Sequence, residues 1–275
     1  MADEEQKKEV VRSYWNSRPC NIYHSKKEFL SKAYFDEVEA KKYFVEPHIP
    51  KFAEFEKWRG KKVLEIGCGI GTDSINFARA GAELTIVEFS DRSLEICKER
   101  FKVFKLEAAF YCGDAEKLSN VLPAQKFDLI YSFGVLHHTP NPENAFAQLA
   151  PFLAPRGEVR LMVYSKISYK LFWLMMENGV KNLQEMDNLI QKYSEAQVDC
   201  PVTFTYTFDE ITFLLNKHAL KVEKIWKDHI FSYEIEPYRN NIYVKDRYWQ
   251  GIDDRLFKEF EKELGWHTMI IAKGI

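Results

Sequence analysis

A glycine-rich segment between a hydrophobic strand and a helix is the feature that most restricts how this chain can fold. The run Lys62–Ile66 is typical of a buried strand, and glycines follow it at positions 67, 69 and 71. Glycine permits a tight turn and lets a ligand approach the main chain closely. A helix that starts near Thr72 would present free N–H groups and the positive end of its dipole to that ligand. The segment therefore predicts a nucleotide-like ligand at a strand-to-helix turn.

Strands and helices alternate from residue 61 onward. Further apolar segments that are typical of buried strands are Glu83–Glu88, Ala108–Cys112, Phe127–Phe133 and Glu158–Tyr164. Apolar residues at helical spacing lie between them. Five such strands with helical connections predict an α/β fold, in which a parallel sheet with right-handed crossovers is covered by helices on both faces.

Helical segments flank this alternation on both sides. Residues 1–20 have the pattern of an amphipathic helix with Val10, Val11 and Tyr14 on one side, and residues 21–60 are predicted to be mostly helical. We therefore expect residues 1–60 to form an N-terminal helical lid on a domain that spans residues 61–275. Two more predicted helices, Ile167–Asn178 and Leu183–Ala196, form a cap inserted at about residues 165–203.

The C-terminal part returns to strands. The run Thr207-Phe-Asp-Glu210 has the form of a capping box that opens a helix. Leu220–Trp226 and Thr268–Ala272 are predicted to be two closing strands. The inserted cap follows the fifth strand, at the sheet edge where ligands bind in such folds, so we expect it to contact the substrate.

Charge and cysteine content exclude several classes of protein. With 39 basic and 41 acidic residues the formal net charge is −2, which argues against a broad nucleic-acid-binding face. No apolar run is long enough to cross a bilayer, and the charged N-terminus lacks the apolar stretch of a secretory signal, so we expect a cytoplasmic protein without a membrane span. Five widely spaced cysteines without a C-x-x-C predict reduced thiols and no metal site.

Acidic residues after the second and third strands bear on the identity of the ligand. Glu88 ends the second strand, where a carboxylate suits the hydroxyls of a ribose. Asp114 follows the third strand, where a side chain can accept a hydrogen bond from the amino group of adenine. The dinucleotide fingerprint needs a glycine where this chain has Thr72. These details favour S-adenosylmethionine over NAD, and an NAD-dependent oxidoreductase is the rival at the level of fold.

Four motifs together resemble those of class I S-adenosylmethionine-dependent methyltransferases. In chain order they are Glu65-Ile-Gly-Cys-Gly-Ile-Gly71, Glu88, Gly113-Asp114-Ala115 and Phe127-Asp-Leu-Ile-Tyr-Ser-Phe-Gly-Val-Leu-His-His138. Over about residues 60–165 the chain is similar to the small-molecule branch that includes the ubiquinone-biosynthesis C-methyltransferases. The resemblance implies a Rossmann-like, seven-stranded, mostly parallel sheet whose last strand runs antiparallel. It also implies S-adenosyl-L-methionine as cofactor and S-adenosyl-L-homocysteine as product.

The same resemblance implies a set of cofactor-binding residues. It assigns the glycine-rich loop to the methionine part of the cofactor, the acid that ends the second strand to the ribose, and the acid after the third strand to the adenine. The end of the fourth strand would lie near the methyl donor. The residues expected on this basis are Glu65, Gly67, Cys68, Gly69, Glu88, Phe89, Asp114, Ala115, Ser132 and Phe133. Glu65 would order the loop or meet the cofactor's amino group through water; alternatively, it only anchors the loop.

Histidines and a tyrosine are the candidate catalytic residues. The methyl group of a sulfonium is already activated, so the protein mainly holds the acceptor in line and excludes water. A general base is needed only if the acceptor arrives protonated. The candidates are His137, His138 and Tyr14, and either histidine can instead orient its loop.

Aromatic side chains outside the sheet are the candidate substrate contacts. Such rings can enclose an organic acceptor, and their faces favour a positively charged sulfonium. The alternative is that they form the core of the cap. The expected substrate-binding residues are Tyr14, Trp15, Tyr23, His24, Tyr206 and Tyr233.

Three functions are compatible with these motifs. The leading hypothesis is S-adenosylmethionine-dependent methyl transfer to a small organic molecule by in-line displacement, on oxygen, nitrogen, carbon or sulfur. Methylation of a macromolecule is less favoured, because Ser132-Phe-Gly-Val stands where an Asn-Pro-Pro-Tyr-type signature would follow the fourth strand. A non-catalytic module that binds the cofactor is the third hypothesis. The sequence predicts a small-molecule partner and leaves the acceptor and the oligomeric state open.

Overall fold

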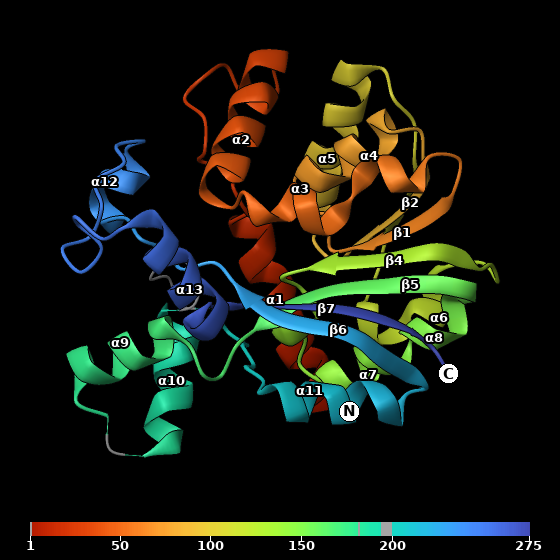
Figure 1. Ribbon diagram of the computed structural model, residues 1–275. Helices are drawn as coiled ribbons and strands as arrows, with labels where there is room; N and C mark the ends of the chain where they lie inside the picture. Colours follow the sequence, from red (N-terminus) through yellow and green to blue (C-terminus); the bar gives the residue numbers. More distant parts are fainter. Residues whose placement is uncertain (1, 181, 194–199) are drawn as a thin grey trace.

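The fold is a seven-stranded sheet with helices on both faces (Figure 1). It is seen in a computed structural model that describes residues 2–180, 182–193 and 200–275. The order of the strands in the sheet is β3-β2-β1-β4-β5-β7-β6. β1 to β5 are parallel, and β7 pairs antiparallel with both β5 and β6. The expected Rossmann-like, mostly parallel sheet is confirmed, with the antiparallel strand at the predicted place.

The strands have bounds close to the predicted ones. They are β1 (Lys62–Ile66), β2 (Glu83–Glu88), β3 (Ala109–Cys112), β4 (Phe127–Phe133), β5 (Leu153–Tyr164), β6 (Leu220–Asp228) and β7 (His267–Gly274). β1, β2 and β4 match the predicted runs residue for residue. β5 begins earlier than predicted because its first residues continue directly from a short helix.

The helices that cover the sheet also follow the predicted alternation. Those before the fifth strand are α1 (Ala2–Ser17), α2 (Lys32–Val45), α3 (His48–Ala53), α4 (Thr72–Arg79), α5 (Asp91–Phe104), α6 (Leu118–Val121), α7 (Pro142–Ala147) and α8 (Leu149–Phe152). Short 3-10 turns are η1 (Phe55–Trp58), η2 (Ala115–Lys117) and η3 (Leu136–His138). After the fifth strand come α9 (Tyr169–Asn178), α10 (Leu183–Tyr193), α11 (Phe208–Lys217), α12 (Ile235–Arg239) and α13 (Asp254–Leu264).

Each face of the sheet buries its own apolar cluster. Side chains alternate along a strand, so in β1 Leu64 and Ile66 join the cluster packed by α6, α7, α8 and α11, while Val63 joins the cluster packed by α3, α4 and α5. Figure 1 shows these two groups of helices on opposite sides of the sheet. The sheet is covered on both faces, as its continuous apolar strands predict.

Side-chain caps set where several helices begin. Ser90 accepts a hydrogen bond from the Ser93 N–H at the start of α5, as predicted. Thr207 and Glu210 form the predicted capping box at the start of α11. Such caps satisfy N–H groups that the first helical turn leaves free. These local signals explain why the beginnings of both helices could be located from sequence.

The N-terminal helix α1 lies against α5. Arg12 pairs with Asp91 at 2.7 Å, and Asn16 accepts a hydrogen bond from the Ser90 hydroxyl at 2.7 Å. The predicted apolar side of α1 is only partly correct, because Val11 is buried whereas Val10 is exposed. Polar contacts thus hold this helix as much as apolar ones do.

Two parts of the region after the fifth strand differ from the prediction. The helix predicted for Leu183–Ala196 is present as far as Tyr193, and its last three residues lie outside the described ranges. α13, which no sequence argument predicted, is capped by Asp253 and contacts β6. Among the helices in the described part of the chain, none is long and apolar enough to span a membrane.

We expect Gly71→Ala to destabilise the fold more than Gly60→Ala does. Both glycines have a positive φ, of 77° and 66°, which costs any other residue about 1 kcal/mol. A Cβ at position 71 would also lie 2.5 Å from the Cys97 Sγ, whereas one at position 60 would meet nothing within 4 Å. Overpacking should bring the total loss for Gly71→Ala to about 2–4 kcal/mol. Urea unfolding measures both values, and equal losses would show that contact with Cys97 is unimportant.

Candidate functional site

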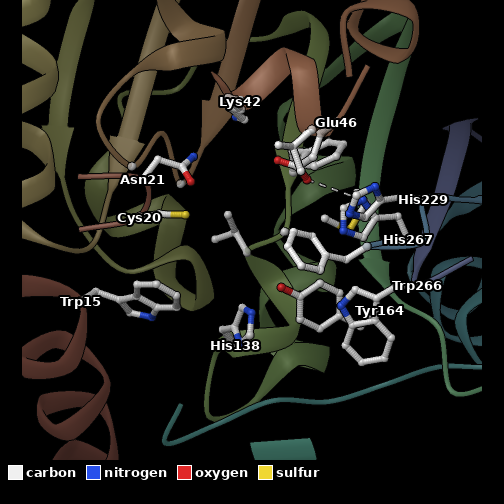
Figure 2. A pocket seen from close by; sticks show the side chains of 18 of the residues that line it. Trp15, Cys20, Asn21, Lys42, Glu46, His138, Tyr164, His229, Trp266 and His267 are labelled. Atoms are coloured by element: carbon white, nitrogen blue, oxygen red, sulfur yellow. Dashed lines mark ion pairs between the residues drawn. The ribbon is translucent and has the colours of Figure 1, made fainter. Parts of the chain in front are cut away.

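A cavity of about 700 Å³ opens at the carboxyl ends of the parallel strands. Its lining includes Ile66 at the end of β1, Glu88 at the end of β2, Phe133 at the end of β4 and Tyr164 at the end of β5. Figure 2 shows the aromatic and ionisable side chains that face this space from several elements. Ligands bind at this edge in open α/β sheets.

The glycine-rich loop forms one wall of the cavity. Gly67, Cys68 and Gly69 all line it. The Gly67 N–H donates to the Val87 carbonyl at 2.7 Å, and a Cβ at Gly67 would lie 2.3 Å from a Val135 methyl carbon. A Cβ at Gly69 would meet only Cys20, at 3.7 Å. The loop is therefore held on one side by its hydrogen bond to the sheet. At Gly69, where the loop lines the cavity, it has no side chain.

Glu88 shapes the loop from the neighbouring strand. Its carboxylate accepts hydrogen bonds from the Gly69 N–H and the Ser90 N–H, both at 2.9 Å. Burial raises the pKa of Glu88, and these N–H donors partly offset that effect. A carboxylate can accept about four hydrogen bonds, so it can bind a ligand's hydroxyls as well as order a loop. This is the arrangement expected of a ribose-binding acid.

Glu65 lies buried on β1 next to the loop, and it does not line the cavity. Its Oε2 has no hydrogen-bond partner among the residues that the structure describes. Burial, and then the negative charge of Asp73, raise the pKa of Glu65 to about 8. A buried oxygen without a partner is costly, so a ligand's donor or a water is expected there.

Asp114 is occupied by the N-terminal helix. Lys8 on α1 pairs with Asp114 at 2.6 Å and with Glu116 at 2.8 Å. Asp114 also caps η2 by accepting a hydrogen bond from the Glu116 N–H. Asp114 and Ala115 both line the cavity, so α1 meets the wall that is expected to hold the adenine.

The two predicted residues at the end of β4 point in different directions. Phe133 lines the cavity, whereas Ser132 is buried and does not. The Ser132 hydroxyl donates to the Ile66 carbonyl at 3.0 Å, which ties β4 to the end of β1. Because neighbouring residues of a strand face opposite sides, only one of this pair can reach a ligand.

The two predicted histidines also separate. His138 lines the cavity, whereas His137 does not. His137 is fully buried between the rings of His138 and Tyr164, and burial holds its pKa well below the ordinary range. His138 Nδ1 lies 2.8 Å from the Val202 carbonyl, which can only accept, so Nδ1 carries the proton. In the neutral form of this ring the lone pair is then on Nε2.

The predicted substrate-binding residues divide in the same way. Trp15, His24 and Tyr233 line the cavity. Tyr14, Tyr23 and Tyr206 do not. Tyr23 is 71% exposed at the surface, and Tyr206 packs on the core beside Phe146.

Several cavity residues were missed by the sequence analysis. They include Lys8, Lys42, Glu46, Trp249, Trp266 and His267. Lys42 on α2 pairs with the buried Asp73 at 2.9 Å. No local pattern marks these residues, because they come from segments far apart in the chain. One feature of the sequence could have indicated the position of His267: antiparallel pairing of the two predicted closing strands brings His267 beside Asp228.

A family model described as a methyltransferase domain matches residues 63–157. Two curated relatives are ubiquinone biosynthesis O-methyltransferases. The one from Coxiella burnetii (strain Dugway 5J108-111) is 33% identical over 101 residues, which cover 37% of this chain and 42% of the relative. The one from Azoarcus sp. (strain BH72) is 34% identical over 100 residues, covering 36% and 42%. The matches thus span less than half the length of either relative.

A solved structure extends the likeness to almost the whole chain. The magnesium protoporphyrin IX methyltransferase of Synechocystis PCC 6803, with bound SAH, is 16% identical with a TM-score of 0.59. The alignment covers 96% of this chain and 98% of that structure. At this identity the likeness concerns the fold.

The chain therefore has the class I methyltransferase fold and carries a methyltransferase domain. The solved structure from Synechocystis holds SAH, which is S-adenosyl-L-methionine without its transferable methyl group. The site fits that cofactor: the loop is bare at Gly69, the Glu88 carboxylate has capacity for a ribose, and Glu65 keeps a buried oxygen without a partner.

We expect Glu65→Gln to change how stability depends on pH. The pKa of Glu65 is raised from 4.5 to about 8, so between these values the folded state holds a proton that the unfolded state releases. Stability contributed by this group therefore falls as pH rises through that range. Glu65→Gln should remove that fall. The free energy of unfolding of the variant, compared with that of the wild type, should therefore be more favourable at pH 8 than at pH 5.

Urea unfolding at the two pH values, with calorimetric titration of S-adenosyl-L-homocysteine, measures this effect. Glu65→Gln should also bind the product more weakly, because an amide group replaces the buried carboxyl oxygen that has no partner among the described residues. Glu83→Gln, at the exposed start of β2, is the matched control. A wild-type pH slope that persists in Glu65→Gln would contradict the assignment.

Proposed function

We propose that the protein transfers a methyl group from S-adenosyl-L-methionine to a small organic molecule. The observation that supports this proposal is one continuous cavity, which joins the glycine-rich loop to an aromatic lining. Gly69, Glu88 and Asp114 form its proposed cofactor side, and Trp15 and Trp249 belong to its aromatic lining. Such a cavity has the size and composition of small-molecule sites.

The aromatic part of the cavity is the proposed acceptor site. Its rings come from α1, from the segment between β6 and α13, and from Trp266, the residue that precedes β7. Residues 1–60 are proposed to act as a lid, since α1 reaches Asp114 through Lys8. The proposed cap contributes Tyr169 and Trp173 from α9. These elements would exclude water from the reacting atoms.

His138 is the proposed general base. It lines the cavity, and its Nδ1–H bond to the Val202 carbonyl fixes the tautomer in which Nε2 is the basic nitrogen. The cofactor, when bound, supplies an activated methyl group on a positively charged sulfur. The chain's own part is to hold the acceptor, take its proton and keep water out.

An oxygen acceptor is favoured by the curated relatives, whose names describe O-methyltransferases. A macromolecular acceptor is not favoured, because the formal net charge is −2 and Trp15, Tyr164 and Trp266 surround the site. A non-catalytic cofactor-binding module would need no such lining. We therefore retain small-molecule methylation as the proposed activity, in the cytoplasm.

Incubation with methyl-labelled S-adenosyl-L-methionine and small aromatic acids, phenols and amines tests this proposal. We expect label in at least one small acceptor, and equimolar S-adenosyl-L-homocysteine. A labelled protein or RNA fraction would favour the macromolecular alternative. Tight binding of S-adenosyl-L-homocysteine without transfer to any fraction would favour the non-catalytic module.

We expect His138→Asn to lower kcat by about 100-fold or more while leaving cofactor affinity nearly unchanged. Asparagine keeps a donor near the position of Nδ1 but offers no basic nitrogen at the position of Nε2. The acidic limb of the wild-type pH–rate profile should disappear in the variant. Rates and product affinity are measured in the same preparations, with His218→Asn as control, because His218 is the C-cap of α11 and does not line the cavity. An unchanged pH–rate profile would show that His138 orients its loop and is not the general base.

A further inference from the structure

Three side chains without a role in the sequence analysis converge on one wall of the cavity. Glu46 follows α2, His229 follows β6, and His267 begins β7. Each offers one ligand atom, and these three atoms all lie within 4.8 Å of one another. Glu46 Oε1 is 3.9 Å from His267 Nδ1, and the two imidazole centroids are 4.6 Å apart (Figure 2).

The donor set suits a divalent transition metal ion. Imidazole nitrogen and one carboxylate are ligands that zinc, cobalt and iron(II) accept, whereas magnesium and calcium prefer oxygen alone. Both imidazoles are buried, and both histidines line the cavity.

The backbone holds both histidines in place. In the β6–β7 ladder Asp228 pairs with His267, which puts His229 beside the start of β7. His229 has a φ of 66°, in the region that disfavours non-glycine residues. Its N–H donates to the Asp228 carboxylate at 2.8 Å, and its carbonyl accepts from the Trp266 N–H at 2.8 Å. These bonds keep the ring turned to the cavity.

A fourth histidine orients the ligand set from behind. His48 Nε2 lies 3.0 Å from His267 Nδ1, so one of these nitrogens donates to the other. His48 Nδ1 is in turn 4.0 Å from Asp228 Oδ1. A hydrogen-bonded partner of this kind fixes the ring and tautomer of a metal-binding histidine, and with Nδ1 held by His48 the ligand atom of His267 would be Nε2. His48 itself is buried and does not line the cavity.

We propose that Glu46, His229 and His267 bind a divalent transition metal ion whose open positions take an ionised oxygen of the acceptor. All three residues line the cavity, and three protein ligands leave coordination positions open to it. The centroid of the Phe133 ring, at the end of β4, is 5.6 Å from that of His267. The open positions thus face the space beside the expected methyl donor.

The part of this proposal that concerns the acceptor rests on the proposed function. It restricts the acceptor to a phenol, an enol or a carboxylic acid. A bound cation lowers the pKa of a hydroxyl group that ligates it. The hydroxyl proton leaves to His138 or to solvent, and the oxygen's electron pair forms the new C–O bond. The C–S bond of the donor breaks at the same time, and its electron pair remains on sulfur.

Cobalt(II) titration of the untagged protein, after treatment with a chelator, tests the metal site. We expect one Co²⁺ per chain, visible d–d absorption typical of nitrogen and oxygen ligands, and a change in that spectrum when a phenolic acceptor is added. If Co²⁺ binding to the wild-type protein did not saturate at one equivalent, the proposal would be overturned.

Variants assign the binding to these residues. Glu46→Gln and His229→Asn should each weaken Co²⁺ binding by at least about 100-fold, and His48→Asn by about 10–100-fold. His218→Asn, which removes a histidine outside the cavity, should bind Co²⁺ as the wild type does. Circular dichroism and the affinity for S-adenosyl-L-homocysteine show that each variant is folded. Equal Co²⁺ affinity in Glu46→Gln, His229→Asn and the wild type would overturn the assignment.

The same measurements separate this proposal from the proposed function. Methyl transfer with no bound Co²⁺, and no loss of rate in chelator, would reject the metal site and leave the methyltransferase activity standing. Stoichiometric Co²⁺ that depends on Glu46 and His229, with no transfer to any acceptor, would support the site and reject the activity.

Discussion

The buried carboxylate of Asp73 is the contact on which the arrangement of the site depends. It lies in the first turn of α4 and accepts hydrogen bonds from Lys42 at 2.9 Å, Tyr43 at 3.0 Å and Tyr131 at 2.9 Å. One side chain thereby joins α2, α4 and β4. A buried charge is tolerated only when it is paired and fully hydrogen-bonded, so this network fixes how α2 lies on the sheet. Glu46 follows α2 directly, and its position near the two histidines depends on that packing.

The network also sets the electrostatics of the cofactor loop. The negative charge of Asp73 adds to burial in raising the pKa of Glu65, while Lys42 acts in the opposite direction. The protein thus keeps a high-pKa acid beside a loop that is expected to receive a zwitterionic ligand. Groups whose environments shift their pKa in this way are common at functional sites.

The cavity wall that is proposed to hold the donor was predictable from sequence, whereas the wall that is proposed to hold the acceptor was not. Gly67 and Gly69 follow β1 and Glu88 ends β2, and the apolar runs of both strands are visible in the sequence, so local pattern placed these residues at one sheet edge. Whether Ser132 or Phe133 faces the cavity depends on the exact pleat of β4, which a motif does not define. Glu46 and His267 lie more than two hundred residues apart, and only the packing of α2 and the β6–β7 register brings them together. That information is tertiary, and no window of sequence contains it.

The place of β7 in the sheet has a consequence for how the chain matures on the ribosome. β7 lies between β5 and β6, although both are synthesised before it. Until residue 267 and its successors emerge, β5 and β6 expose unpaired edges, which are prone to pair with other chains. The donor loop can form early, but the wall that carries His267 is completed only when this late strand inserts. The glycine-rich loop and the wall that carries His267 are therefore completed at different times during synthesis.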